Sequence, residues 1–162
     1  MAEHTSDRLL RAQWRPAPDT LVPEPDTLLL SWLTEPGLLT RRLKSSCPSN
    51  FRLEVLNAAA SLLRAVALCC GKQHCIYAAT EAPAATVAAH PWLLQMGAAS
   101  LGETLQHRAA DYGVQVNRGP FSFAHFTAAG LPTAVLPPAE DAWGRRSQFQ
   151  LNGATLTVTE VF

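Results

Sequence analysis

Two charged residues occupy strand positions at which this chain otherwise places apolar side chains. In the segment 155–162 alternate side chains share one face of a strand, so Glu160 points the same way as Leu156 and Val158. A carboxylate among core-facing residues needs a partner or a ligand, because burying an unpaired charge is costly. Glu160 is therefore the first candidate site residue.

The second candidate carries the opposite charge. In the segment 61–70, Arg64 shares a face with Leu62, Val66 and Leu68, and the other face is apolar as well. This pattern is typical of a central strand that is covered on both sides. Two explanations remain open. Arg64 either has a structural role, as the ion-pair partner of Glu160 or with its head group extended to an edge, or lines a closed pocket in which it binds a ligand carboxylate while Glu160 accepts from a ligand hydroxyl.

The elements that must position these residues follow an α+β pattern. Asn152-Gly153 between two β-rich runs predicts a terminal hairpin, since both turn residues need a positive φ. Further strands are expected at 51–57, 61–70, 73–80, 112–117 and 121–126. Helices are expected at 26–33, from Thr34 onward with Pro36 in the first turn, and as two short helices within 91–107. We predict a single antiparallel sheet of about six or seven strands with helices packed on one face.

Composition limits the classes of function. The 162 residues carry 13 basic and 13 acidic side chains, so the formal net charge is zero and nothing favours nucleic acid or an anionic membrane as a partner. A single domain over 1–162 is expected, with 1–25 as an irregular Pro-rich segment that holds a short helix near Arg8. No apolar run approaches the roughly 18 residues of a membrane span, and no signal-peptide pattern is present. A cytoplasmic location is therefore expected.

The four cysteines are expected to be reduced in that compartment. They are Cys47, Cys69, Cys70 and Cys75. Their spacing matches no zinc-binding pattern, and His74 beside Cys75 is the only pairing that suggests one. No metal is expected.

The terminal hairpin carries a motif that resembles a known family. Trp143-Gly-Arg-Arg-Ser, followed by Leu156-Thr-Val-Thr-Glu-Val-Phe, is similar to the chorismate lyase (chorismate pyruvate-lyase) family, with Glu160 on the family's acidic site residue. Leu62-Leu-Arg64 resembles the strand that bears its ligand-binding arginine. The resemblance covers roughly residues 25–162.

Two further segments resemble parts of the same family that meet the ligand through the backbone. Met96-Gly-Ala-Ala-Ser-Leu101-Gly resembles a family loop and places Leu101 on the backbone-binding position. Gly37-Leu-Leu39 resembles the start of its N-terminal helix, with Leu39 at the position that contacts the ligand. Ser100 stands where the loop usually has a proline, which predicts a looser loop.

The resemblance implies a reaction and an enclosed pocket. Members of the family convert chorismate to 4-hydroxybenzoate and pyruvate without a cofactor, as the first step toward the ubiquinone ring. Arg64, with the N–H groups of Leu39 and Leu101, would hold the ring carboxylate, and Glu160 would hold the ring hydroxyl. Arg64 and Glu160 are thus the expected catalytic residues, and all four are expected to bind substrate.

Several points stay open after the resemblance. The enolpyruvyl carboxylate needs a second cation, and Arg41, Arg42, Arg145 and Arg146 are unranked candidates. A monomer is expected, with chorismate and 4-hydroxybenzoate as its small-molecule partners. The alternative is a non-catalytic domain that binds an aromatic acid, like the effector domains of some bacterial transcription regulators, which share this fold.

Overall fold

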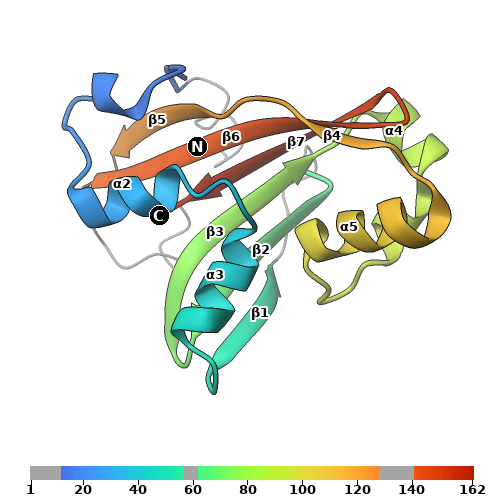
Figure 1. Ribbon diagram of the computed structural model, residues 1–162, viewed down its shortest axis with the longest axis horizontal. Helices are drawn as coiled ribbons and strands as arrows, with labels where there is room; N and C mark the ends of the chain where they lie inside the picture. Colours follow the sequence, from blue (N-terminus) through green and yellow to red (C-terminus); the bar gives the residue numbers. More distant parts are fainter. Residues whose placement is uncertain (1–11, 57–61, 128–140) are drawn as a thin grey trace, which may run out of the picture.

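The computed structural model describes residues 12–56, 62–127 and 141–162 (Figure 1). Its helical elements are the 3-10 helix η1 (Pro18–Thr20), α2 (Thr27–Leu33), α3 (Leu39–Ser46), α4 (Ala84–Ala89), the 3-10 helix η2 (Pro91–Gln95) and α5 (Leu101–Tyr112). Its strands are β1 (Phe51–Leu56), β2 (Arg64–Cys70), β3 (Gln73–Glu81), β4 (Val116–Arg118), β5 (Ser122–Thr127), β6 (Asp141–Leu151) and β7 (Ala154–Val161). No helix in these ranges is long and apolar enough to cross a membrane.

The strands form one antiparallel sheet of seven strands in the order β1-β2-β3-β7-β6-β4, with β5 also paired to β6. β3 separates β2 from β7, with Thr80 opposite Arg64 and Ala78 opposite Glu160. Two strand spacings and an offset of two residues put the Cα atoms of Arg64 and Glu160 about 12 Å apart on one face of the sheet. The sheet therefore brings together two residues that are far apart in the sequence.

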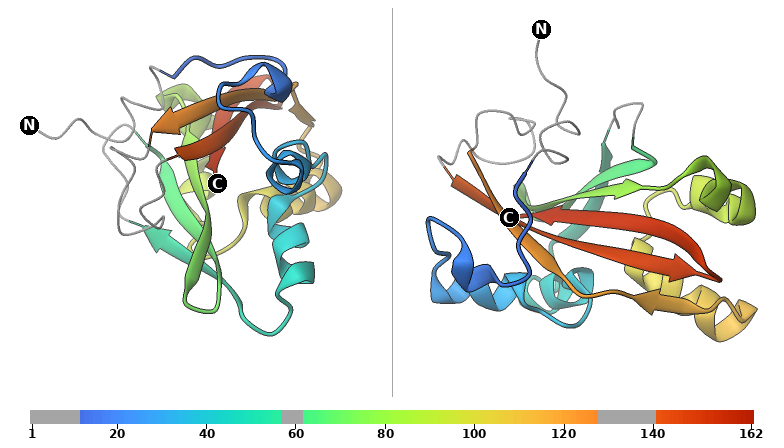
Figure 2. Two further views of the ribbon diagram at one scale, coloured as in Figure 1. Left: turned by 90° about the vertical axis from the view of Figure 1, so that its left-hand side faces the viewer. Right: turned by 90° about the horizontal axis from the view of Figure 1, so that it is seen from above.

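Helices α2, α3 and α5 lie on the same side of the sheet, as the views from the side and from above show (Figure 2). Leu39 and Leu43 of α3 pack against Val66 and Leu68 of β2, which seats this helix on the sheet. Leu105 of α5 packs against the terminal hairpin in a separate cluster. The opposite face carries mostly small side chains, against which Trp14 packs. The predicted α+β arrangement, with helices on one face, is confirmed.

The terminal hairpin follows its sequence signal closely. Asn152 and Gly153 adopt φ values of 50° and 85°, the left-handed conformation that this turn requires. In β7, Leu156 and Val158 are buried on the face that carries Glu160, while Thr159 is buried on the other face. The alternation that singled out Glu160 is thus confirmed.

Several local predictions were wrong at their boundaries. Helix α3 begins at Leu39 rather than near Thr34, so Pro36 precedes the helix instead of occupying its first turn. Tyr112 ends α5 and is not in a strand, because Gly113 closes that helix in the left-handed conformation. Helix α4 was not predicted, since the run 84–89 is dominated by alanine and lacks a clear apolar stripe. The short helix expected near Arg8 lies outside the described residues.

Candidate functional site

A cavity of about 70 Å³ lies between the sheet and the first turns of α3 and α5. We call its sheet side chains the floor: Leu53, Arg64, Val66, Leu68, Ala78, Thr80, Arg118, Arg145, Ser147, Phe149, Val158 and Glu160. We call its helix side the cover: Gly37, Leu38, Leu39, Thr40, Ser100, Leu101 and Gly102. The four residues singled out from the sequence, which are Arg64, Glu160, Leu39 and Leu101, all line this cavity.

Arg64 joins the floor to the loop in front of α5. Its Nη2 atom donates to the carbonyl oxygens of Gly97 at 2.7 Å and Ala99 at 2.6 Å. Burial in the cavity wall lowers the pKa of the Arg64 guanidinium from its ordinary value. The result is a half-buried cation that holds the loop leading to Leu101.

Glu160 forms its ion pair with the neighbouring strand. Arg145 of β6 stands directly opposite Glu160, and its Nε atom donates to Oε2 at 2.6 Å. Arg145 is only 1% exposed, donates through Nη1 to the carbonyl of Glu35 at 2.6 Å, and lies 4.3 Å from the ring centre of Phe121. Of the two explanations left open, an ion pair between Arg64 and Glu160 is therefore wrong for the described structure.

Leu39 and Leu101 are each the first residue of a helix. An N–H group in the first turn has no partner inside its helix, and the aligned peptide dipoles make this end positive. Two helix starts that line one cavity can therefore offer N–H donors to an anion. This is a physical reason for the backbone contacts that the resemblance implies at these two positions.

The Ser100 side chain connects the starts of α3 and α5. Its hydroxyl is the N-cap of α5 and accepts from the N–H of Glu103 at 3.4 Å. The same hydroxyl donates to Oγ1 of Thr40 at 3.2 Å, which joins the starts of α3 and α5. Ser100 thus gives α5 a capping side chain that a proline lacks.

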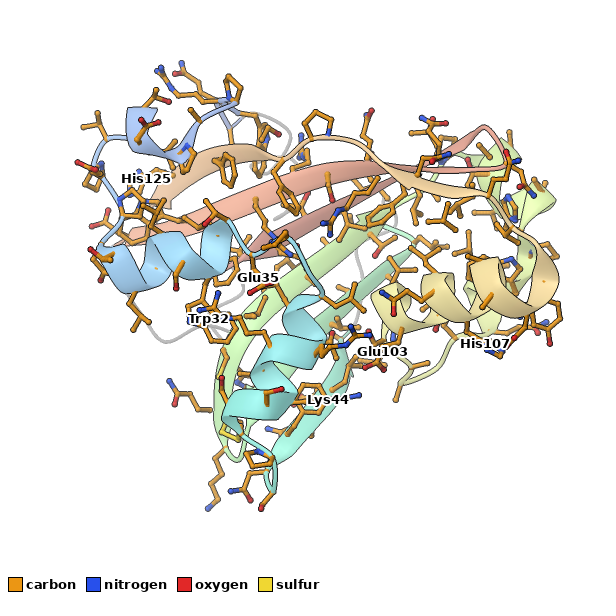
Figure 3. All side chains as sticks on the ribbon, in the orientation of Figure 1. Trp32, Glu35, Lys44, Glu103, His107 and His125 are labelled. Atoms are coloured by element: carbon orange, nitrogen blue, oxygen red, sulfur yellow. A yellow bond between two sulfur atoms is a disulfide. The ribbon has the colours of Figure 1, made fainter. Side chains whose placement is uncertain are left out.

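Three further contacts hold the cover in place. Lys44 of α3 points toward Glu103 of α5 and pairs with it at 2.9 Å (Figure 3). Arg41 of α3 donates to Oε1 of Gln106 at 3.1 Å. Gly102 lies so close to Leu38 that a Cβ atom at 102 would meet Cδ2 of Leu38 at 2.5 Å. The two helix starts are therefore in direct contact across the cavity.

The expectation of four reduced cysteines was wrong for two of them. Cys47, at the end of α3, is disulfide-bonded to Cys70, at the end of β2, with Cα atoms 5.9 Å apart. Cys69 and Cys75 are free thiols. Helix α3, whose first turn is part of the cover, is therefore joined covalently to β2 at its other end.

Arg118 is a floor residue that the sequence reasoning missed. It lies at the end of β4, donates through Nη2 to the carbonyl of Pro36, and stacks 4.6 Å from the ring centre of Phe121. Burial and the charge of Arg145 lower its pKa, while Glu160 acts in the opposite direction. The signal was present, because Val114, Val116 and Arg118 alternate as the residues around Arg64 do.

The remaining arginine candidates do not line the cavity. Arg42 pairs with Glu35 at 3.3 Å and stacks on Trp32. Both of these partners are labelled in Figure 3. Arg146 faces the other side of β6, where it donates to Oγ1 of Thr159. Of the four arginines proposed from the sequence, Arg145 alone lines the cavity as the structure describes it.

Glu54, Cys69 and His74 form the group of described residues whose donor atoms lie close enough to hold a metal, all within 4.8 Å of one another. His74 therefore meets Cys69, not the adjacent Cys75 that the sequence suggested. Arg52 already binds Glu54 at 2.6 Å, and burial raises the pKa of the Cys69 thiol. Both effects oppose a metal here, because a metal needs an available carboxylate and a thiolate. The cluster also lies outside the cavity.

Comparison with known proteins assigns the chain to a family. The family model described as chorismate lyase matches residues 53–162, which is more than half of the chain. The chain belongs to the chorismate lyase family. A relative named probable chorismate pyruvate-lyase from Pseudomonas aeruginosa (strain UCBPP-PA14) is 31% identical over 153 residues, covering 83% of this chain and 82% of the relative.

Other members of the chorismate lyase family align over still more of the chain. A probable chorismate pyruvate-lyase from Halorhodospira halophila is 31% identical, covering 100% of this chain and 95% of the relative. A probable chorismate pyruvate-lyase from Shewanella loihica is 28% identical, covering 93% of this chain and 86% of the relative. Arg64, Leu101 and Glu160 lie inside the range that the chorismate lyase model matches, and Leu39 precedes it.

Proposed function

We propose that this chain is a chorismate pyruvate-lyase, which converts chorismate to 4-hydroxybenzoate and pyruvate. The observation that carries the proposal is the cavity, whose lining brings together Arg64, Glu160 and the starts of α3 and α5. Chorismate has a carboxylate and a hydroxyl at opposite ends of its ring. The cavity therefore offers a cationic group to one end of the substrate and a hydrogen-bond acceptor to the other.

Arg64 is the proposed anchor of the ring carboxylate, assisted by the N–H groups of Leu39 and Leu101. A planar guanidinium matches a carboxylate in two parallel hydrogen bonds, and the two helix starts add partial positive charge. Glu160 accepts from the ring hydroxyl through Oε1, because Oε2 already binds Arg145 at 2.6 Å. The two anchors fix the ring so that its reacting edge has one orientation.

The bond changes in the proposed reaction balance within the substrate. The ether bond between the ring carbon and the enolpyruvyl oxygen breaks, and its electrons remain on that oxygen, which becomes the keto oxygen of pyruvate. The hydrogen on the neighbouring ring carbon, which also bears the hydroxyl, moves to the enolpyruvyl methylene and forms the methyl group of pyruvate. The ring becomes aromatic, which drives the reaction. We infer that the protein acts by positioning and electrostatics and that the elimination is redox-neutral, so it needs no redox cofactor.

Access to the cavity requires the cover to move in this proposal. A cavity of about 70 Å³ is smaller than the ~150 Å³ that holds a benzene ring. Ligand entry would separate the first turns of α3 and α5 and so break the bond between Ser100 and Thr40. Lid motions of this kind can limit turnover.

The finer expectations belong to the same proposal. We infer that residues 1–162 act as one domain and as a monomer in the cytoplasm, and that the product supplies the ubiquinone ring. These points rest on the resemblance to the family.

Incubating the purified protein with chorismate tests the proposed activity. We expect 4-hydroxybenzoate and pyruvate in equal amounts, measured by chromatography and by a coupled lactate dehydrogenase assay. Arg64→Gln and Glu160→Gln should each lower kcat/KM by about 100-fold or more, because each removes a positioned electrostatic contact.

Two outcomes would contradict parts of the proposal. Near-normal turnover in Arg64→Gln would remove Arg64 from the site. Binding of chorismate or 4-hydroxybenzoate without any product would instead favour a binding domain related to the regulator effector domains.

A further inference from the structure

The charges around the cavity do not balance. Among residues 12–56, 62–127 and 141–162, its wall carries three guanidinium groups, from Arg64, Arg118 and Arg145, and one carboxylate, from Glu160. Arg145 and Glu160 form an ion pair and neutralise each other. Arg64 and Arg118 remain as two half-buried cations, and the pKa of each is lowered by burial. Two desolvated cations in one small cavity favour a ligand with two negative charges.

The position of the second charge on the ligand follows from the proposed function, on which this step rests. If Arg64 holds the ring carboxylate and Glu160 holds the hydroxyl at the opposite end, the enolpyruvyl ether is attached to the carbon beside that hydroxyl. The second carboxylate must therefore lie at the Glu160 end of the cavity. Arg64, which donates to the loop before α5, lies too far toward the other end to bind both carboxylates.

Two cations lie near Glu160, and they differ in how many donors are in use: Arg145 uses two, whereas Arg118 donates through Nη2 to the carbonyl of Pro36. Arg145 is 1% exposed and uses Nε and Nη1 for Glu160 and the carbonyl of Glu35. Arg118 is more exposed, and it lies 4.6 Å from the ring centre of Phe121, on which Arg145 also stacks at 4.3 Å, which places Arg118 at this end. Arg118 also lines a second cavity of about 300 Å³, which shares Gly37, Leu38, Gly102 and Phe149 with the first and gives room for a side chain of the ring.

We propose that Arg118 binds the second carboxylate of the substrate, so that the cavity recognises an aromatic or cyclohexadiene ring with two carboxylates. Arg64 takes the ring carboxylate and Arg118 takes the carboxylate carried on the ether. Arg145 serves as the positioning residue that neutralises and orients Glu160. After the ether bond breaks, the ring product keeps only the carboxylate at Arg64. The carboxylate bound by Arg118 is now part of pyruvate, so the ring product no longer contacts Arg118.

A pair of unreactive probes tests this assignment by isothermal titration calorimetry. The dianion 3-(carboxymethoxy)-4-hydroxybenzoate carries both carboxylates, and 4-hydroxy-3-methoxybenzoate has the same ring with only one. We expect Arg118→Gln to lower the affinity for the dianion by roughly 30-fold or more, which is the size expected when one partner of a buried charge pair is removed. The affinity of Arg118→Gln for the monoanion should change by less than about threefold, whereas Arg64→Gln should have a lower affinity for both probes.

Controls separate a binding role from loss of structure or of net charge. Arg52→Gln removes the same charge from an exposed arginine of β1 that lines neither cavity, and should change the ratio of the two affinities by less than about twofold. Arg118→Lys keeps a cation and should recover part of the affinity for the dianion. Thermal unfolding of Arg118→Gln should stay within a few degrees of the unmodified chain.

Different results would overturn the assignment of Arg118 and the proposed lyase activity. If Arg118→Gln weakens both probes equally, or neither, the assignment of Arg118 is overturned even when the unmodified chain turns chorismate over. The unmodified chain could instead make no 4-hydroxybenzoate and still bind the dianion more tightly than the monoanion, with the difference lost in Arg118→Gln. The lyase proposal would then fail, and the site for two carboxylates would stand.

Discussion

The floor of the cavity presents charged side chains from strands, whereas the cover presents backbone N–H groups from the first turns of two helices. Arg145 and Glu160 of the floor are fixed by the register of β6 and β7, which pair over the whole terminal hairpin. The cover is held by a few side-chain contacts, such as Ser100 with Thr40 and Lys44 with Glu103. The floor can therefore keep charges in place, while the cover can yield to a ligand.

This difference predicts where stability and ligand exchange are controlled. Breaking the Arg145–Glu160 pair of the floor leaves a buried charge unpaired and should cost both folding free energy and catalysis. A change in the cover should act mainly on the affinity for ligands and on how fast they enter and leave. Each of the four variants below tests one part of this division.

The largest effect is expected when the buried ion pair is broken. Arg145→Met leaves the Glu160 carboxylate without its 2.6 Å partner and should lower the free energy of unfolding by about 3 kcal/mol or more. Urea unfolding measures this loss. The double variant Arg145→Met/Glu160→Gln should recover much of the stability but not the activity. A loss below about 1 kcal/mol in the single variant would show that the pair is not effectively buried.

The disulfide between the end of α3 and the end of β2 should give the next largest effect. Replacing Cys47 and Cys70 by serine opens a loop with a sequence separation of 23 and should cost about 3 kcal/mol by chain entropy. Urea unfolding without reductant measures it, with Cys75→Ser as the control that leaves the bond intact. Thiol titration of the unfolded, unreduced chain should find only the two thiols of Cys69 and Cys75. Four reactive thiols would contradict the bond.

The N–H group of Leu101 can be removed with little other change to the backbone of the cover. Proline is tolerated at the first position of a helix, so Leu101→Pro should keep α5 while deleting one N–H group. Ser100 already has the extended conformation that precedes a proline, with φ −68° and ψ 131°. We expect the affinity for 4-hydroxybenzoate to fall about tenfold, which corresponds to ~1.4 kcal/mol for one N–H bonded to a carboxylate.

Leu101→Ala is the matched control, because it shortens the same side chain and keeps the N–H group. Equal losses in the proline and alanine variants, measured by calorimetry, would mean that the side chain and not the backbone donor matters at this position.

The smallest effect is expected at the outer contact of the cover. The pair between Lys44 and Glu103 is 45% and 39% exposed, so Glu103→Gln should change the free energy of unfolding by less than about 0.5 kcal/mol. Release of 4-hydroxybenzoate, followed by stopped-flow fluorescence, should become about twofold faster. High salt should have the same effect on the unmodified chain and almost none on the variant. Unchanged release in the variant would show that this pair does not restrain the cover.

Much of the floor could be predicted from the sequence because strand alternation is local. Arg64 and Glu160 each interrupt an apolar alternation, and both line the cavity. The same test applied to the segment before Arg118 would have found that residue as well. The cover was harder to predict, since Pro36 suggested a helix start that the structure places at Leu39. A helix boundary depends on packing against the rest of the chain as well as on local propensity.

By itself, the sequence determined which residues are unusual and which way they point. The two-residue period of a strand and the Asn152-Gly153 turn are properties of neighbouring residues, so they need no knowledge of the fold. Only the tertiary structure decided which residues meet. Glu160 pairs with Arg145 across the hairpin and not with Arg64, because β3 lies between β2 and β7. Cys47 likewise reaches Cys70 only because α3 packs on β2. Such contacts depend on the order of strands and the seating of helices, which short-range patterns leave undetermined.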